Sequence, residues 1–263
     1  MNPIILAIIL VPSIGLIAGV GLGVAAHFMK VEENEKAKAL REVLPGANCG
    51  ACGFSGCSGY AEALANSPHL KTNLCTVGGD AVAEKISEIL GVAAEKTSPK
   101  RAVVRCSGTV DATKKKALYQ GIQTCQAAAM LQNGSGSCLY GCIGLGDCAA
   151  ACDNSAISVR QGVAVVDESK CFACGKCVSA CPKKIIEIIP KGTYPYVACM
   201  NVDTGAKTKA VCTAGCIGCR MCVKACEHGA IEMIGARAYI HSDQCVGCLK
   251  CVDACKFGVI KKV

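Results

Sequence analysis

The sequence contains no tryptophan, 4 phenylalanines and 6 tyrosines, so aromatic residues make up only 4% of its 263 residues. Aromatic side chains interleaved with basic ones are typical of nucleic-acid-binding motifs, and no such motif is present. The sequence also lacks a Walker loop, a dinucleotide fingerprint placed after a strand, and a covalent flavin motif. We therefore expect no nucleic-acid partner and no nucleotide substrate bound directly by this chain.

Charged side chains are absent from residues 1–29, where Ile4–Met29 form one apolar run. At about 1.5 Å per residue this run can cross a hydrocarbon core of about 30 Å. A cleaved signal peptide is the alternative, but the segment lacks the basic start of an export signal. Basic residues follow the run and none precedes it, which predicts a single-pass anchor in the cell membrane with the N-terminus outside and the remaining chain in the cytoplasm.

Glycines recur every fourth residue within this apolar run, at Gly15, Gly19 and Gly23. A stripe of small residues lets a second membrane helix approach closely. The stripe therefore favours a partner helix, although glycine is also common in membrane helices in general.

Cysteine is abundant, with 24 residues in the chain. Disulfide frameworks belong to short secreted proteins, and cysteines two residues apart lie too close for unstrained mutual bridges. Thiolates around shared metal centres fit the pattern better, with 4Fe-4S clusters favoured over zinc. Each cluster with four thiolates would add about −2 to the formal charge of +8, so the apparent basicity does not indicate a nucleic-acid partner.

Two segments, CFACGKCVSACP at Cys171–Cys181 and CVGCLKCVDACKFG at Cys245–Cys255, have the ferredoxin spacing C-x2-C-x2-C-x3-C. In this spacing three cysteines hold one cluster and the fourth reaches the cluster of a partner motif. An offset of 74 residues relates them within a longer duplication. It carries Cys125, Cys138, Cys142, Cys148, Cys152, Cys171, Cys174, Cys177 and Cys181 onto Cys199, Cys212, Cys216, Cys222, Cys226, Cys245, Cys248, Cys251 and Cys255.

The duplication predicts two tandem ferredoxin units with two clusters each. In the second unit the crossing rule groups Cys216, Cys219, Cys222 and Cys255, and separately Cys226, Cys245, Cys248 and Cys251. In the first unit it groups Cys152, Cys171, Cys174 and Cys177. The residue that matches Cys219 is Leu145, so we assign the nearer Cys138 as the replacement, with Cys142, Cys148 and Cys181.

Four cysteines then remain: Cys106, Cys125, Cys199 and Cys212. The segments VVRCSGTVDATKKK and YVACMNVDTGAKTK are alike around Cys106 and Cys199. These four residues either bind a further cluster between the units or are buried free thiols, which pack as small apolar side chains.

A different motif, PGANCGACGFSGC, precedes the ferredoxin units. Its cysteines, with one farther on, supply the four thiolates that one cluster needs: Cys49, Cys52, Cys57 and Cys75. Zinc is the alternative here, because C-x2-C followed by two spaced thiols is also a zinc pattern. The total is five clusters, with the four remaining cysteines as candidates for a sixth.

The apolar N-terminal run, PGANCGACGFSGC with Cys75, and the C-terminal polyferredoxin together resemble the B subunit of the Rnf complex, an ion-translocating ferredoxin:NAD oxidoreductase. The resemblance covers essentially the whole chain, although shorter members have one ferredoxin unit. It implies that the chain relays electrons from soluble ferredoxin to the other membrane and peripheral subunits of a translocase, without catalysing the reaction alone. A tethered polyferredoxin of another respiratory or hydrogenase complex, or a non-redox zinc protein, are the alternatives.

The expected fold is α+β, small and organised by its clusters. We expect a transmembrane helix in residues 1–29, a 4Fe-4S domain in 30–78 with a helix over 59–66, a connector in 79–100 with a helix from Asp80 to about Lys96, and ferredoxin units in 101–190 and 191–263. An acidic carrier such as ferredoxin would be steered to basic residues near the cluster motifs, unless these are ordinary solvated lysines. The candidates are Lys183, Lys184, Lys191, Lys207 and Lys209.

Overall fold

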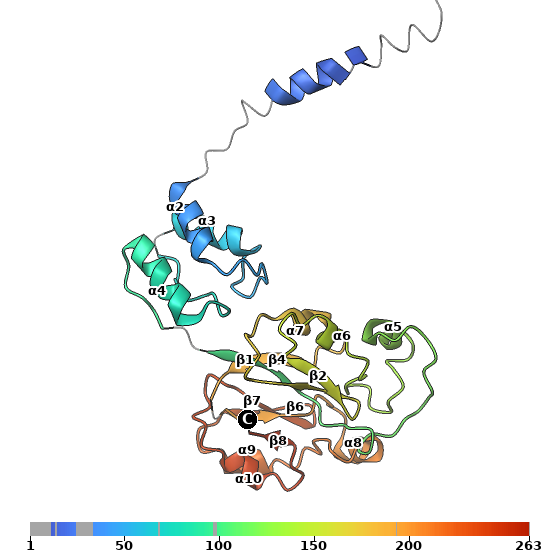
Figure 1. The fold of residues 1–263 in the computed structure, drawn as a ribbon. Helices are drawn as coiled ribbons and strands as arrows, with labels where there is room; N and C mark the ends of the chain where they lie inside the picture. Colours follow the sequence, from blue (N-terminus) through green and yellow to red (C-terminus); the bar gives the residue numbers. More distant parts are fainter. Residues whose placement is uncertain are drawn as a thin grey trace, which may run out of the picture.

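The computed structural model describes residues 12–13, 15–24, 34–67, 69–96, 99–192 and 194–262. Residues 15–24 are helical, and no helix in the described ranges is both long and apolar enough to span a bilayer. The other residues of the predicted span, 1–11, 14 and 25–29, lie outside the described ranges. From residue 34 onward the chain forms a helical domain and then two small units that contain strands (Figure 1).

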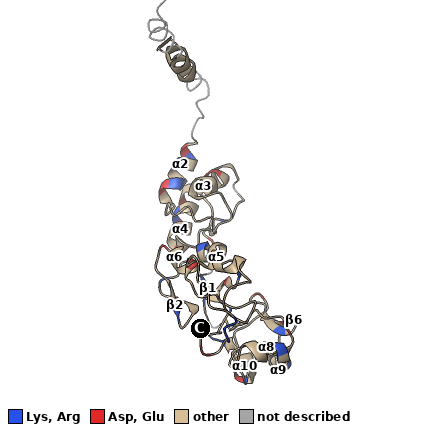
Figure 2. Cartoon of the chain, turned by 90° about the vertical axis from the view of Figure 1, so that its right-hand side faces the viewer, with Lys and Arg blue, Asp and Glu red and all other residues tan. Residues whose placement is uncertain are grey.

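The helical domain packs three helices around one core: α2 (Glu35–Val43), α3 (Cys57–Asn66) and α4 (Gly79–Leu90). Leu40 of α2 and Ile86 of α4 are fully buried, together with Tyr60 and Leu64 of α3. The helix α4, which the sequence assigned to a connector, thus contributes to the core of this domain. Figure 2 shows the domain between the N-terminal helical segment and the two strand-containing units.

The first unit has two antiparallel strand pairs and three short helices. Strand β1 pairs with β4, and β2 forms a hairpin with β3. Its elements are β1 (Lys100–Val104), α5 (Cys125–Met130), α6 (Asp147–Ala150), β2 (Ile157–Arg160), β3 (Val163–Val166), α7 (Lys176–Ala180) and β4 (Ile186–Pro190).

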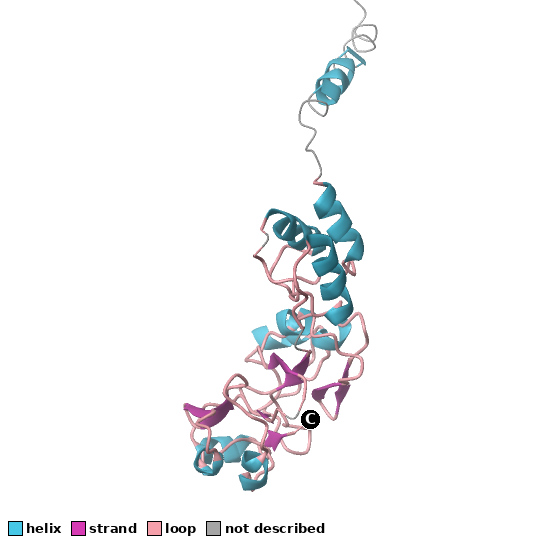
Figure 3. Ribbon diagram, turned by 90° about the vertical axis from the view of Figure 1, so that its left-hand side faces the viewer, coloured by secondary structure: helices cyan, strands magenta, loops and turns pink. Residues whose placement is uncertain are grey.

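The second unit repeats this plan, with β5 paired to β8 and a hairpin of β6 and β7. Its elements are β5 (Tyr196–Val197), α8 (Gly205–Val211), α9 (Met221–Ala225), β6 (Ile231–Ile234), β7 (Arg237–Ile240), α10 (Lys250–Ala254) and β8 (Ile260–Lys261). The hairpins at 157–166 and 231–240 differ by the 74-residue offset found in the sequence. Short strands and loops predominate in both units, unlike the helical domain (Figure 3).

Glycine is required at one equivalent position in each unit. Gly144 and Gly218 have φ of 82° and 71°, a region that other residues rarely adopt. A Cβ at Gly144 would lie 2.4 Å from the carbonyl oxygen of Gly162, and one at Gly218 would lie 2.5 Å from that of Ala236. The cysteine loops therefore pack directly onto the hairpins.

The two units contact each other through polar groups around the buried Arg105. Arg105 of the first unit is 4% exposed and forms an ion pair with Glu187 (Nε to Oε2, 2.9 Å). Its guanidinium lies 4.3 Å from the ring centre of Tyr239 in the second unit, and the Tyr239 hydroxyl donates to Glu187 Oε1 at 2.8 Å. Thr113 also forms a backbone bridge with Cys212, so the units share backbone pairing.

Candidate metal centres

Four cavities in the two units are each lined by four cysteines. Two belong to the second unit and contain the groups that the sequence predicted: Cys216, Cys219, Cys222 and Cys255, here called the second inner site, and Cys226, Cys245, Cys248 and Cys251, the second outer site. Short helices α9 and α10 each begin within one cysteine motif and turn Cys222 and Cys251 inward.

The first unit also holds such a cavity, lined by Cys125, Cys142, Cys148 and Cys181, here called the first inner site. The structure differs from the predicted grouping of Cys138 with Cys142, because Cys125 lines this cavity and Cys138 does not. The carboxylate of Asp147, at the start of α6, accepts hydrogen bonds from the backbone N–H groups of Cys125 (2.7 Å) and Gln126 (3.0 Å). These bonds hold the first turn of α5 against α6, so that Cys125 supplies the fourth thiol of a cavity whose repeat position for Cys219 is Leu145.

The fourth cavity lies between the units and takes two cysteines from each, Cys106 and Cys138 from the first and Cys199 and Cys212 from the second. We call it the interunit site. Cys106 follows β1 and Cys199 follows β5, which are equivalent strands, and Cys138 and Cys212 each lie four residues before an inner-site cysteine. The site is thus built from structurally equivalent positions of the two units, although the 74-residue offset relates Cys199 to Cys125 and not to Cys106. The sequence contained this signal in the likeness of VVRC and YVAC.

Two further cysteine groups lie outside these four cavities. We call the predicted group of Cys152, Cys171, Cys174 and Cys177 the first outer site; burial raises the pKa of Cys177, and the nearby charges of the other three raise it further. In the helical domain, burial raises the pKa of Cys75, and the charges of Cys57 and Cys49 add to the effect. Of these cysteines, Cys57 and Cys75 pack against the domain core, as does Cys52, and the four together are called the amino-terminal site.

Burial makes these thiols difficult to ionise without a cation. It raises the pKa to about 11 for six of them, and neighbouring thiolates contribute in the same direction. The six are Cys106, Cys148, Cys177, Cys199, Cys222 and Cys251. At neutral pH they are suited to a centre whose iron charge compensates several thiolates at once.

The arrangement of the four thiols around each cavity also favours a cluster over a single ion. A zinc ion needs four ligands at about 2.0–2.3 Å. No group of three or more cysteine, histidine or acidic side chains in the described part of the chain is placed to hold one ion. The thiolates therefore fit a cubic 4Fe-4S cluster better than zinc.

Backbone amides point at the cysteine sulfurs, as expected around a sulfur-rich anionic centre. Donors include Ala102 to Cys171 (3.4 Å), Ala156 to Cys152 (3.3 Å) and Gly78 to Cys75 (3.4 Å). In the interunit site, a Cβ at Gly108 would lie 3.5 Å from both Cys106 Sγ and Cys212 Sγ, and it would clash with Thr113 Oγ1 at 2.4 Å. Glycine therefore keeps this cavity open.

Of the candidate basic residues, Lys183 is engaged, because its Nζ donates to the carbonyl oxygen of Leu139 at 2.6 Å. Lys191 is half-buried. The others, Lys184 and, on α8, Lys207 and Lys209, are exposed. Only these three have the accessibility that contact with a carrier requires.

Comparison with known proteins places the same segments in iron–sulfur families. A family model described as a putative Fe-S cluster matches residues 44–77, and one described as a 4Fe-4S dicluster domain matches residues 141–185 and 215–259. Neither family model covers Cys106, Cys125, Cys138, Cys199 or Cys212.

Three relatives have similar names. The B subunit of the Na(+)-translocating ferredoxin:NAD(+) oxidoreductase complex of Acetobacterium woodii is 39% identical over 81% of this chain and 64% of its own length. The B subunit of the proton-translocating complex of Clostridium ljungdahlii is 35% identical over 82% of this chain and 76% of its own. The B subunit of the ion-translocating oxidoreductase complex of Methanosarcina acetivorans is 36% identical over 79% and 81%. The chain thus spans slightly less than two thirds of the first relative's length.

Proposed function

Because the chain belongs to the family of B subunits of ion-translocating ferredoxin:NAD(+) oxidoreductase (Rnf) complexes, we propose that it relays electrons from reduced ferredoxin to partner subunits of such a complex. When bound, 4Fe-4S clusters supply one-electron transfer. The chain's own residues hold, orient and shield these centres. Twenty-four cysteines in six groups of four would bind six clusters, five within the domains and one in the interunit site.

The order of the six sites is the observation that supports this relay most directly. An open cleft lined by Cys49 of the amino-terminal site and Cys174 of the first outer site joins the helical domain to the first unit. Within that unit, the charge of Cys177 acts on Cys148 of the first inner site. The amino-terminal site, the first outer site and the first inner site thus follow one another as neighbours.

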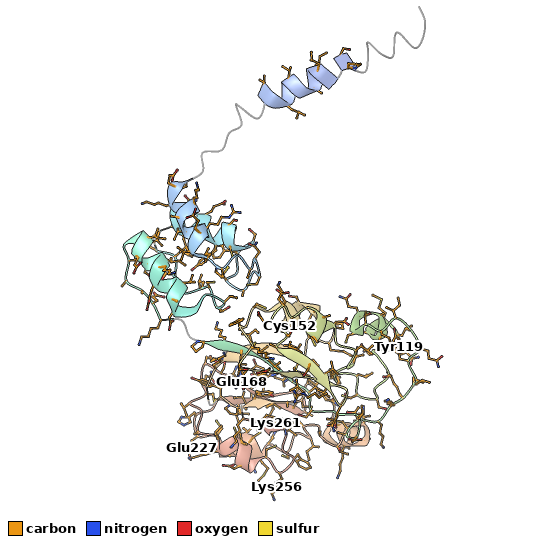
Figure 4. All side chains as sticks on the ribbon, in the orientation of Figure 1. Tyr119, Cys152, Glu168, Glu227, Lys256 and Lys261 are labelled. Carbon is orange, nitrogen blue, oxygen red and sulfur yellow. The ribbon has the colours of Figure 1, made fainter. Side chains whose placement is uncertain are left out.

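The second half of the row continues through the interunit site. The backbone N–H of Cys142, from the first inner site, donates to Cys106 Sγ at 3.3 Å. A backbone hydrogen bond from Cys216, of the second inner site, reaches Cys199 in the same way. Cys222 then acts on Cys251 of the second outer site. In Figure 4, Cys152 lies on the side of the first unit near the helical domain, and Glu227, next to Cys226, lies at the far end of the second unit.

Anchoring would keep this row beside its partners. An anchor in residues 1–29 would tether the relay in the cell membrane, with residues 34–262 on the cytoplasmic side, where thiols stay reduced. Tethering raises the effective concentration of the relay at its partner subunits. The exposed lysines of α8, the helix whose Thr208 lines the interunit cavity, would attract an acidic ferredoxin.

The proposal is tested by anaerobic purification followed by iron and sulfide analysis and by reduction with ferredoxin. We expect a brown protein with about 24 irons per chain, because six cubes contain four irons each. Membranes that carry Cys222→Ser should lose ferredoxin-dependent NAD reduction, whereas Ser242→Ala, in a turn of the same unit, should retain it. A colourless protein with stoichiometric zinc, or full activity in Cys222→Ser membranes, would contradict the relay.

A further inference from the structure

The interunit site differs from the other sites in the groups that contact its sulfurs. Thr113 Oγ1 donates to Cys212 Sγ at 3.5 Å, and Asn201 Nδ2 donates to Cys138 Sγ at 3.8 Å. Among the residues that the structure describes, these are the two side chains that donate to a cysteine sulfur; all other donors to sulfur are backbone amides. The site therefore combines side-chain and backbone donors.

The position of Asn201 shows that this contact is specific to the site. Asn201 follows Cys199 by two residues, as Gly108 follows Cys106. The backbone N–H of Gly108 donates to Cys106 Sγ at 3.4 Å, and that of Asn201 contributes a backbone hydrogen bond to Cys199. Asn201 adds a side-chain amide to this shared arrangement. It is only 1% exposed, so water does not compete for that amide.

Hydrogen bonds to cluster sulfurs favour the reduced state, because reduction adds negative charge to the sulfurs that accept them. Burial acts in the opposite direction, since an enclosed site disfavours added charge, and burial is common to all four cavities. The charge of Arg105, which also lines the interunit site, is largely neutralised by Glu187. Cationic side chains also line the neighbouring sites, Lys183 in the first inner and Arg220 in the second inner site, so the feature that sets the interunit site apart is its two side-chain donors.

We propose that Thr113 and Asn201 give the interunit site the highest reduction potential in the row, so that electrons crossing between the two units collect there. The inference rests on the proposed function. One electron would arrive from a reduced neighbouring site, which is oxidised by that electron, and no covalent bond forms or breaks. Thr113 and Asn201 are positioning residues, which act through the sulfurs of Cys212 and Cys138.

The test is a redox titration of the full chain, followed by electron paramagnetic resonance, for the wild type and for Thr113→Val and Asn201→Leu. Each variant keeps the approximate shape of the side chain and removes its donor. In each variant we expect the ratio of reduced to oxidised protein at a fixed potential to fall about tenfold for one centre. This corresponds to a shift of about −59 mV in the reduction potential of a one-electron couple. In the wild type, one centre becomes reduced first as the potential is lowered. In the double variant Thr113→Val, Asn201→Leu, this centre should no longer be the first to be reduced.

The matched control is Thr208→Val. Thr208 is fully buried and lines the same cavity, but its hydroxyl donates to the carbonyl oxygen of Asp203 at 3.3 Å and to no sulfur. This variant should keep the wild-type potentials. If Thr208→Val shifts the same centre as strongly as Asn201→Leu, packing explains the effect and the inference is wrong.

Iron content separates failure of this inference from failure of the proposed function. Cys199→Ser should lose about four irons together with the centre that Thr113 and Asn201 affect. Iron equal to the wild type in Cys199→Ser would mean that the interunit site holds no cluster. Loss of four irons in Cys199→Ser, with unchanged potentials in the Thr113 and Asn201 variants, would leave the relay intact and refute the tuning.

Discussion

Replacing Cys125 by serine should empty the first inner site and spare the other five. Cys125 lines that cavity with Cys142, Cys148 and Cys181, while Cys138 lines the interunit site. Serine is a poor substitute for a thiolate ligand of iron. The expected iron content is about 20 per chain instead of about 24, a loss of one sixth, with the same fractional loss of sulfide.

A second substitution should restore the site. Leu145 occupies the repeat position of Cys219, and Cys219 lines the equivalent cavity in the second unit. The double variant Cys125→Ser, Leu145→Cys recreates the ferredoxin spacing of the second unit, so iron should return to about 24. The assay is iron and sulfide analysis of anaerobically purified protein, with Ala129→Ser on the same helix as a control that does not line the cavity.

The pair of variants also decides between the two groupings of cysteines. If Cys125→Ser keeps all its iron, Cys125 is not a ligand, and the cavity that it lines is not a cluster-binding site. If Cys125→Ser instead removes the centre that Cys199→Ser removes, the sequence-based grouping, with Cys125 in the interunit set, would be correct after all. Only loss of a separate centre, recovered by Leu145→Cys, agrees with the structure.

Three further predictions concern the anchor, the helical domain and the interface between the units. Deleting residues 1–29 should move the protein from the membrane to the soluble fraction with unchanged iron, whereas Gly19→Leu should keep it in the membrane but reduce co-purification of partner subunits. Burial raises the pKa of Tyr60 from 10.0 to about 12, so the folded state holds this proton more tightly than the unfolded state. The resulting stabilisation is complete below pH 10 and decreases from pH 10 to 12. In thermal unfolding, Tyr60→Phe should remove this dependence on pH. Tyr239→Phe removes the hydrogen bond to Glu187 and should lower the free energy of unfolding by about 1–2 kcal/mol, measured by denaturant titration, without loss of iron.

Motif spacing was sufficient to predict which cysteines share a cavity in the second unit, because all eight lie within two regular motifs whose crossing rule is local in sequence. It was insufficient for the first unit, where the choice between Cys125 and Cys138 depends on the path of a long loop. The backbone N–H of Ser137 donates to Lys114 O at 2.7 Å, and that of Lys116 donates to Ser135 O at 2.9 Å. This pairing directs Cys138 toward the second unit, while Asp147 holds Cys125 inside the first.

The helices show a similar limit. Apolar periodicity predicted a helix from Asp80 to about Lys96, but α4 spans Gly79–Leu90 and is capped by Gly91, whose φ is 70°. Periodicity reveals that one helix face is buried but not which surface covers it. The partners of Ile86 are Leu40 and Tyr60, from helices that precede it by 20 residues or more, so only the folded domain shows that α4 is part of the core.

The interunit site has a consequence for the origin and synthesis of the chain. Its four cysteines come in equal number from the two copies, so a single ancestral unit would have carried only two of them and could not have built the site within one molecule. Duplication thus supplied a four-cysteine cavity that neither copy possessed. During translation the same constraint sets an order: Cys106 and Cys138 leave the ribosome first and have no complete ligand set until Cys199 and Cys212 have followed.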